Sequence, residues 1–134
     1  VAMRAASERD LVARQYVETF SLVLDTLVPR LCAARELGLT LPQAIVHTQI
    51  QTMAELPDSL IARKCGAEVA DQAKFIARQV LEFAPPGTDD WGRALADFDF
   101  WLRSDGHRRN PGTTADLIAA ALFAGLRDGL LARA

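Results

Sequence analysis

Two polar stretches of the chain carry the residue types that bind phosphates and metal ions. The first covers residues 57–66 (PDSLIARKCG), and the second covers residues 107–116 (HRRNPGTTAD). Both combine carboxylates with cationic side chains and a glycine, which is more polar chemistry than a plain helical bundle needs. We therefore treat them as the candidate functional segments.

The second stretch has the pattern of an anion site at the start of a helix. Thr113 and Asp116 form a Ser/Thr-x-x-acid capping box, which predicts that Thr113 caps a helix. Unpaired N–H groups and the macrodipole attract anions to such a start, glycine allows close backbone approach, and guanidinium groups match phosphate geometry. The candidate ligands are Arg108, Arg109, Asn110, Gly112, Thr113 and Thr114. The alternative is an ordinary capped helix after a solvated basic loop.

The first stretch offers a carboxylate and two cations. Asp58 is a candidate Mg²⁺ ligand, because magnesium sites often use one or two carboxylates together with substrate phosphates. Arg63 and Lys64 are candidate phosphate ligands. The alternative is that Asp58 or Ser59 caps the following turn and that the two cations are solvated.

Other metal and thiol chemistry is disfavoured. His47 and His107 are not spaced as a metal pair, and no HExxH or CxxC pattern occurs. We expect His47 to lie in the core. Cys32 and Cys65 are too sparse for a disulfide framework, which favours a reducing cytoplasm over an oxidising compartment, with a reactive thiol as the alternative. Asp25, among apolar neighbours, is expected on the solvent side of its helix or at a helix boundary.

Apolar residues recur at three- and four-residue steps along most of the chain, which predicts helices. Nothing alternates with a period of two for long, so we expect an all-α bundle of five or six helices that forms one domain over residues 1–134. The first expected helix runs from a Ser7 capping box to Gly38, with a bend or division at Pro29. The next three run from Thr40 to Leu56, from Ser59 to Lys64 and from Ala67 to Ala84. After a linker at residues 85–87, the last two run from Thr88 to Leu102 and from Thr113 to about Ala132.

Composition excludes several functions. Half of the 134 residues are apolar and 24% are charged, which supports a packed core. The net charge of −2 argues against a nucleic-acid partner, which usually needs a basic surplus. No charge-free apolar window of about 18 residues occurs, so we expect no membrane span.

The two candidate segments resemble motifs of the triphosphoribosyl-dephospho-CoA synthase family. Residues 110–117 (NPGTTADL), followed by an alanine-rich helix with Leu122 and Phe123, resemble the signature near the end of that family's sequences. Residues 57–64 with Gly66 are similar to an earlier motif, especially in an archaeal and methylotroph-like branch. The resemblance spans nearly the whole chain and matches the C-terminal part of such an enzyme.

This resemblance implies a cytoplasmic transferase that moves the triphosphoribosyl group of ATP onto 3′-dephospho-CoA, or a related acceptor, and releases adenine. ATP with Mg²⁺ would then contact the cations and the helix start of both segments. Asp58 and Asp116 are the candidates for metal ligand and general base, and either can take either role.

The family's proteins are longer than this chain and carry further motifs in their N-terminal half. We therefore expect a missing N-terminal segment, or a second chain, as a partner. A second class of function stays open, namely a non-catalytic helical module that binds a nucleotide or a protein.

Overall fold

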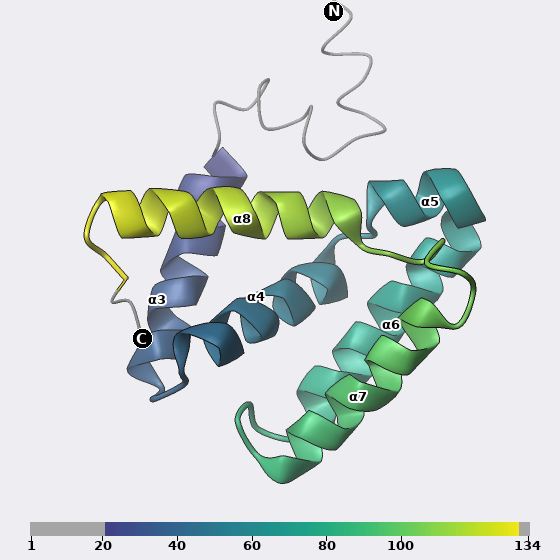
Figure 1. The fold of residues 1–134 in the computed structure, drawn as a ribbon, viewed down its shortest axis with the longest axis horizontal. Coiled ribbons are helices and arrows are strands. Elements are labelled where there is room, and N and C mark those ends of the chain that lie inside the picture. Colours follow the sequence, from purple (N-terminus) through teal and green to yellow (C-terminus); the bar gives the residue numbers. More distant parts are fainter. Residues whose placement is uncertain (1–20, 132–134) are drawn as a thin grey trace, which may run out of the picture. The chain divides into compact units, whose positions relative to one another are not determined.

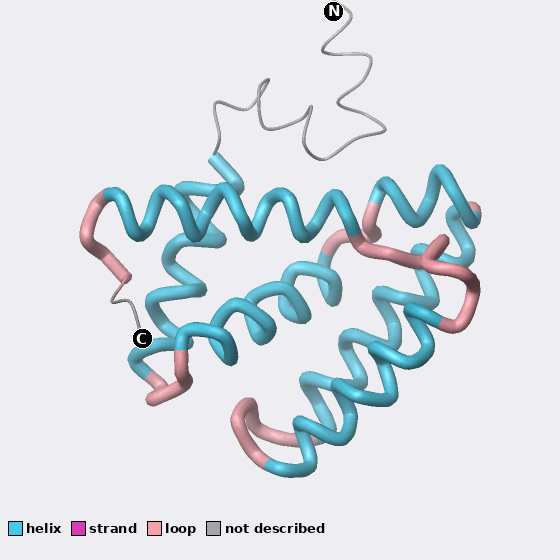
Figure 2. The backbone as a smooth tube through the Cα atoms, viewed as in Figure 1, coloured by secondary structure: helices cyan, strands magenta, loops and turns pink. Residues whose placement is uncertain are grey.

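The computed structural model describes residues 21–131, and all of its regular structure is helical. No strand occurs in this range, which confirms the all-α prediction (Figures 1 and 2). The predicted Ser7 capping box lies outside the described residues. The elements are η1 (Leu22–Leu27), α3 (Val28–Glu36), α4 (Leu41–Glu55), α5 (Ser59–Cys65), α6 (Ala67–Phe83), α7 (Asp89–Arg103) and α8 (Gly112–Arg127).

The chain divides into two compact units. The first unit contains residues 1–49 and 113–134, and the second contains residues 50–112. Helix α4 runs from the first unit into the second, and α8 begins at the last residue of the second. A single domain over residues 1–134 stays a prediction.

In the first unit, Pro29 lies where the helix changes its winding. Residues Leu22–Leu27 form a π-helix, in which the Val28 N–H donates to the Val23 carbonyl, and α-helical winding begins at Val28. Proline has no N–H and so cannot complete the α-helical ladder behind it, whereas it fits the first turn of a new helix. The predicted bend or division near Pro29 is therefore a change from π-helical to α-helical winding. Asp25 is exposed, as expected.

The boundary between α3 and α4 follows the local sequence signals. Gly38 adopts a φ of 92° directly after the Leu37 C-cap, the left-handed geometry that ends many helices. Thr40 and Gln43 then form the predicted reciprocal capping box, with the Gln43 N–H 3.3 Å from Thr40 Oγ1 and the Thr40 N–H 3.0 Å from Gln43 Oε1. His47 on α4 is buried, which confirms the expected core position.

In the second unit, α6 and α7 form a helical hairpin around one core. Gly87, with a φ of 86°, turns the linker, and the Thr88 side chain caps α7 by accepting from the Trp91 N–H. The small residues of α6 let α7 approach closely, so that Trp91 and Phe98 are buried. The buried residues of this core are Ile50, Met53, Ala54, Ile61, Ala70, Ala73, Ala77, Val80, Ala84, Trp91 and Phe98.

Candidate functional site

Asp58 forms the N-cap of α5 and is almost fully buried. Its Oδ1 accepts hydrogen bonds from the Leu60 N–H at 2.9 Å and the Ile61 N–H at 3.1 Å, and the residue is 2% exposed. Two orphan donors of the helix are thereby satisfied. The alternative interpretation, in which Asp58 caps the following helix, is therefore confirmed.

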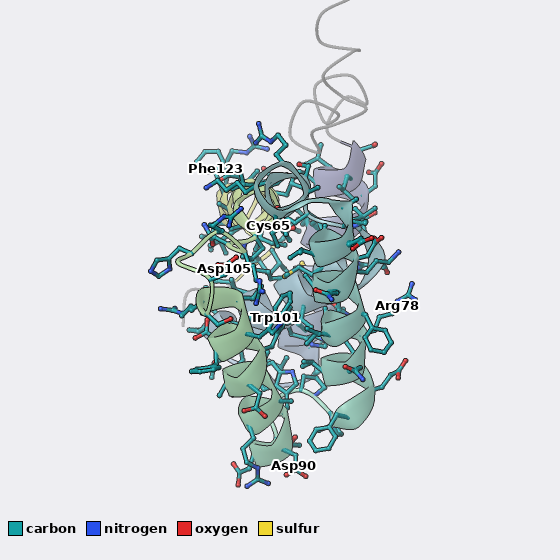
Figure 3. The ribbon with its side chains drawn as sticks, turned by 90° about the vertical axis from the view of Figure 1, so that its right-hand side faces the viewer. Cys65, Arg78, Asp90, Trp101, Asp105 and Phe123 are labelled. Atoms are coloured by element: carbon teal, nitrogen blue, oxygen red, sulfur yellow. The ribbon has the colours of Figure 1, made fainter. Side chains whose placement is uncertain are left out.

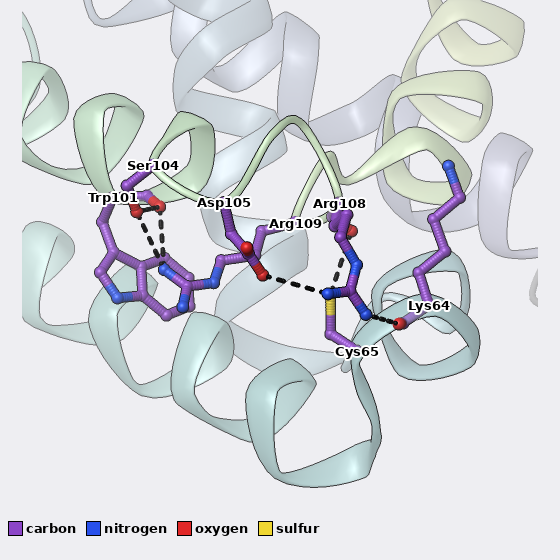
Figure 4. A network of polar contacts seen from close by, with 7 residues as sticks. All are labelled: Lys64, Cys65, Trp101, Ser104, Asp105, Arg108 and Arg109. Carbon is purple, nitrogen blue, oxygen red and sulfur yellow. Dashed lines mark hydrogen bonds and ion pairs between the residues drawn. The ribbon is translucent and has the colours of Figure 1, made fainter.

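The loop after α7 folds onto the C-terminal end of α5. Arg108 Nη2 lies 2.8 Å from the carbonyl oxygen of Lys64, and the Cys65 thiol lies 3.2 Å from the carbonyl oxygen of Arg108 (Figure 4). Asp105 holds the same guanidinium, with 3.7 Å between Arg108 Nη1 and Asp105 Oδ2. The two candidate segments are distant in sequence but lie side by side.

Arg109 closes the C-terminal end of α7. Its Nη1 lies 3.2 Å from the Trp101 carbonyl oxygen and 3.0 Å from Ser104 Oγ, and its guanidinium carbon lies 4.4 Å from the centroid of the Trp101 ring (Figure 4). A cation over an indole face and two hydrogen bonds fix this side chain in place. Arg109 thus holds the loop, and the Trp101 ring is the surface on which its guanidinium lies.

Helix α8 begins at Gly112, one residue before the predicted cap. Thr113 lies in the first turn instead of at the capping position, so that part of the prediction is wrong. A Cβ on Gly112 would lie 2.5 Å from Leu60 Cδ2, so a larger residue at this position would require the Leu60 side chain to shift. The close approach expected of Gly112 is made to α5 and contributes a further contact between the segments.

The turn that precedes α8 contains a strained residue that sequence reasoning missed. His107 has a φ of 65°, in the left-handed region that is uncommon for residues other than glycine. The Asn110 N–H then donates to the His107 carbonyl at 3.2 Å, and Gly112 N–H donates to the Asn110 carbonyl at 2.9 Å. The adjacent Gly106, also at positive φ, was the available signal.

The candidate cations at the end of α5 are open to solvent. Arg63, Lys64 and Arg108 are exposed, and they surround the helix terminus to which the 104–111 loop is attached. Arg63 and Lys64 are neighbours in sequence and Arg108 bonds to the Lys64 carbonyl, so these three residues are called here the α5 cationic cluster. Such a cluster can bind a phosphate group.

The remaining candidates lie on α8 in the first unit. Thr113 and Thr114 are buried, whereas Asp116 is exposed. Asp58 belongs to the second unit and Asp116 to the first. Among residues 21–131, no group of three or more His, Cys, Asp or Glu side chains is arranged to hold a metal ion.

The chain belongs to a family of nucleotide-dependent transferases. Residues 1–133 match the sequence model of the family described as ATP:dephospho-CoA triphosphoribosyl transferase, which confirms the resemblance drawn from the two motifs. One relative is the probable 2-(5''-triphosphoribosyl)-3'-dephosphocoenzyme-A synthase of Malonomonas rubra, 31% identical over 108 residues. That match covers 76% of this chain and 32% of the relative, so the chain spans about a third of the relative's length.

No solved structure matches the chain. In the described part of the chain, no helix combines the length and the apolar character needed to cross a membrane.

Proposed function

We propose that this chain is part of an enzyme that transfers the triphosphoribosyl group of ATP to a hydroxyl group of 3′-dephospho-CoA, or of a related acceptor, with release of adenine. The observation that carries the proposal is the family match over residues 1–133. The packing of the two candidate segments against each other supports it, because it gathers cations from both around the end of α5.

The reaction exchanges one bond at the ribose for another. The C–N bond between ribose and adenine breaks with its electron pair leaving on adenine, and a C–O bond to the acceptor hydroxyl forms. The hydroxyl proton passes to a general base, and the departing adenine takes up a proton. Because positive charge develops on the ribose as the C–N bond opens, a nearby carboxylate or phosphate stabilises the transition state.

The α5 cationic cluster is the proposed contact for the triphosphate. Arg63 and Lys64 are exposed on α5, and Arg108 keeps further N–H donors beyond the one that Lys64 accepts. Arg109 acts in this proposal by holding the loop, since its guanidinium already contacts Trp101 and Ser104. The other candidate phosphate contacts are Asn110, Gly112, Thr113 and Thr114.

The two candidate carboxylates have different surroundings, which suggests different roles. Asp116 is exposed on the first turns of α8, so we assign it the direct role, as general base or as a ligand of Mg²⁺. Asp58 is buried and its Oδ1 already accepts two backbone hydrogen bonds, so we assign it the positioning of α5 and its cations.

We also propose a cytoplasmic location and a partner segment. Cys32 and Cys65 are free thiols, which agrees with a reducing compartment. The rest of the catalytic apparatus would come from a further N-terminal segment or from a second chain, because the match covers 32% of the Malonomonas rubra relative.

The experiment is adenine release from ATP by the complete natural protein, followed by chromatography with and without 3′-dephospho-CoA and with and without Mg²⁺. We expect acceptor-dependent adenine release. The Arg63→Ala, Lys64→Ala double variant should raise the KM for ATP, whereas Arg103→Ala, an exposed arginine at the end of α7, should not. Nucleotide binding without adenine release under every condition would favour the non-catalytic module.

A further inference from the structure

A groove of about 490 Å³ lies between α6 and α7, and none of the residues assigned above to the triphosphate lines it. Its wall is mostly apolar, and both helices contribute residues to it. Figure 3 shows one of these residues, Trp101 of α7, between the two helices. The lining residues are Ile76, Gln79, Val80, Phe83, Arg93, Ala94, Asp97, Phe98 and Trp101. An apolar groove between two helices is the shape that receives the apolar face of a third helix.

The groove leaves a large aromatic side chain open to solvent. Phe83, at the end of α6, is 66% exposed and lines the groove, and the lining residues Ile76 and Trp101 are only half-buried. Phe75, on the same helix, is 61% exposed but lies outside the groove. The two phenylalanines therefore differ mainly in whether they contact the groove.

The two helices that form the groove carry a net negative charge. Helices α6 and α7 together carry seven acidic and four basic side chains. Two of the four are paired within α7, since Arg93 bonds to Asp90 and Arg103 bonds to Asp99, and the guanidinium of Arg78 donates to the Ala54 carbonyl. The groove lining itself contains one residue of each sign, Asp97 and Arg93. A partner with lysine or arginine beside its apolar face would complement this charge.

We infer that the groove between α6 and α7 binds an amphipathic helix with basic flanks, supplied by the part of the family's protein that this chain does not cover. The length of the relative supports this occupant, since the match covers 32% of it and leaves about two thirds that can contribute such a helix. This inference goes beyond the proposed activity, because it assigns a docking surface and needs no nucleotide.

The test uses the 134-residue chain and, as probe, the Malonomonas rubra relative with its matched region deleted, produced as a separate chain. Binding is measured by isothermal titration calorimetry without ATP or acceptor. We expect a 1:1 complex that Phe83→Gln weakens about tenfold or more, as expected for a central aromatic contact. Phe75→Gln is the matched control and should change the Kd by less than about twofold. Circular dichroism checks that both variants keep their helices.

Two further variants change α7, the helix opposite Phe83. One fills the groove, and the other reverses a charge in its lining. Ala94→Phe should fill the groove and abolish binding, and Asp97→Lys should weaken binding and reduce its salt dependence. Absence of binding, or equal weakening by Phe83→Gln and Phe75→Gln, would overturn the inference. A dimer of the chain alone that Phe83→Gln dissociates and Phe75→Gln does not would assign the groove to a second copy instead. Because no outcome depends on adenine release, failure here and failure of the proposed activity are distinguishable.

Discussion

The Arg108 guanidinium donates a hydrogen bond to the carbonyl oxygen of Lys64, with 2.8 Å between Nη2 and the oxygen. This bond satisfies a carbonyl at the C-terminal end of α5, where helices leave such groups unpaired. It also holds the Arg108 guanidinium beside the backbone of Lys64, another of the residues that we assign to the triphosphate. One contact thus serves both the folding of the 104–111 loop and the shape of the cationic cluster.

We expect Arg108→Ala to act on both stability and substrate binding. Loss of the bond to Lys64 should lower the free energy of unfolding by about 1 kcal/mol, which denaturant titration measures. In the complete protein, the KM for ATP should also rise. Arg103→Ala removes an exposed arginine from an i,i+4 pair with Asp99 and should cost about 0.5 kcal/mol or less, with the KM unchanged. An unchanged KM in Arg108→Ala would remove this arginine from the phosphate site.

Two substitutions of Asp58 can separate its role as a helix cap from the role of its negative charge. Asparagine caps helices nearly as well as aspartate, so Asp58→Asn should keep the melting temperature close to that of the parent. Asp58→Ala should lower the free energy of unfolding by about 1 to 2 kcal/mol, because both N–H groups at the start of α5 lose their acceptor. If Asp58 only positions α5, Asp58→Asn should keep most of the adenine release. Loss of activity in a stable Asp58→Asn protein would instead give the charge a direct role.

Asp116→Asn should remove adenine release while leaving stability nearly intact. The residue is exposed, so the exchange of an oxygen for an amide group leaves the packing of α8 unchanged. Asp128→Asn, at another exposed aspartate beyond the end of α8, is the control and should keep full activity. If Asp116→Asn retained most of the rate of adenine release, the start of α8 would be an ordinary helix terminus and not part of the active site.

Gly112→Ala should destabilise the chain because the new methyl group would lie 2.5 Å from Leu60 Cδ2. The Leu60 side chain must shift to make room for this methyl group, and we expect a cost of about 1 kcal/mol. Gly92→Ala, inside α7 with no atom within 4 Å of the added Cβ, should instead stabilise by about 0.5 to 1 kcal/mol through helix propensity. If the contact is the cause, adding Leu60→Ala to Gly112→Ala should cost less than the sum of the two single changes.

His47 should make stability depend on mildly acidic pH. Burial lowers the pKa of His47 below its ordinary value of 6.5, so the folded state disfavours the protonated ring. The associated stability is present above pH 6.5, the unfolded value, and is lost as the pH falls through the lowered folded pKa. We expect His47→Gln to flatten the pH dependence of the denaturation midpoint between about pH 7 and 5. An equally steep fall in both proteins would assign the effect to other groups.

Helix boundaries with strong local signals could be predicted from the sequence. The Thr40 and Gln43 capping box and the Thr88 cap act within four residues of the chain, so the sequence contains everything that determines them. The start of α8 was predicted one residue late, at Thr113, and the packing of Gly112 against Leu60 of another helix has no signal in the local sequence.

The choice of site residues stays a prediction, and the contacts of these residues could not be predicted from the sequence. The sequence indicated the cations of both segments, and their proximity followed from the family resemblance alone. That Arg108 and Arg109 bind backbone carbonyls at the ends of α5 and α7 depends on how the 104–111 loop folds back. Loop paths depend on tertiary packing, for which a single sequence contains no periodic signal.

Gly66 alone connects α5 to α6, and its backbone angles of φ 97° and ψ 161° are accessible almost only to glycine. The direction change between the two helices is therefore set by two torsion angles of one residue. An inserted or deleted residue there would change both the direction of α6 and the distance between the ends of α5 and α6. In an alignment of homologous chains, gaps should consequently be absent at positions 65–67, while the 85–87 linker tolerates changes in length.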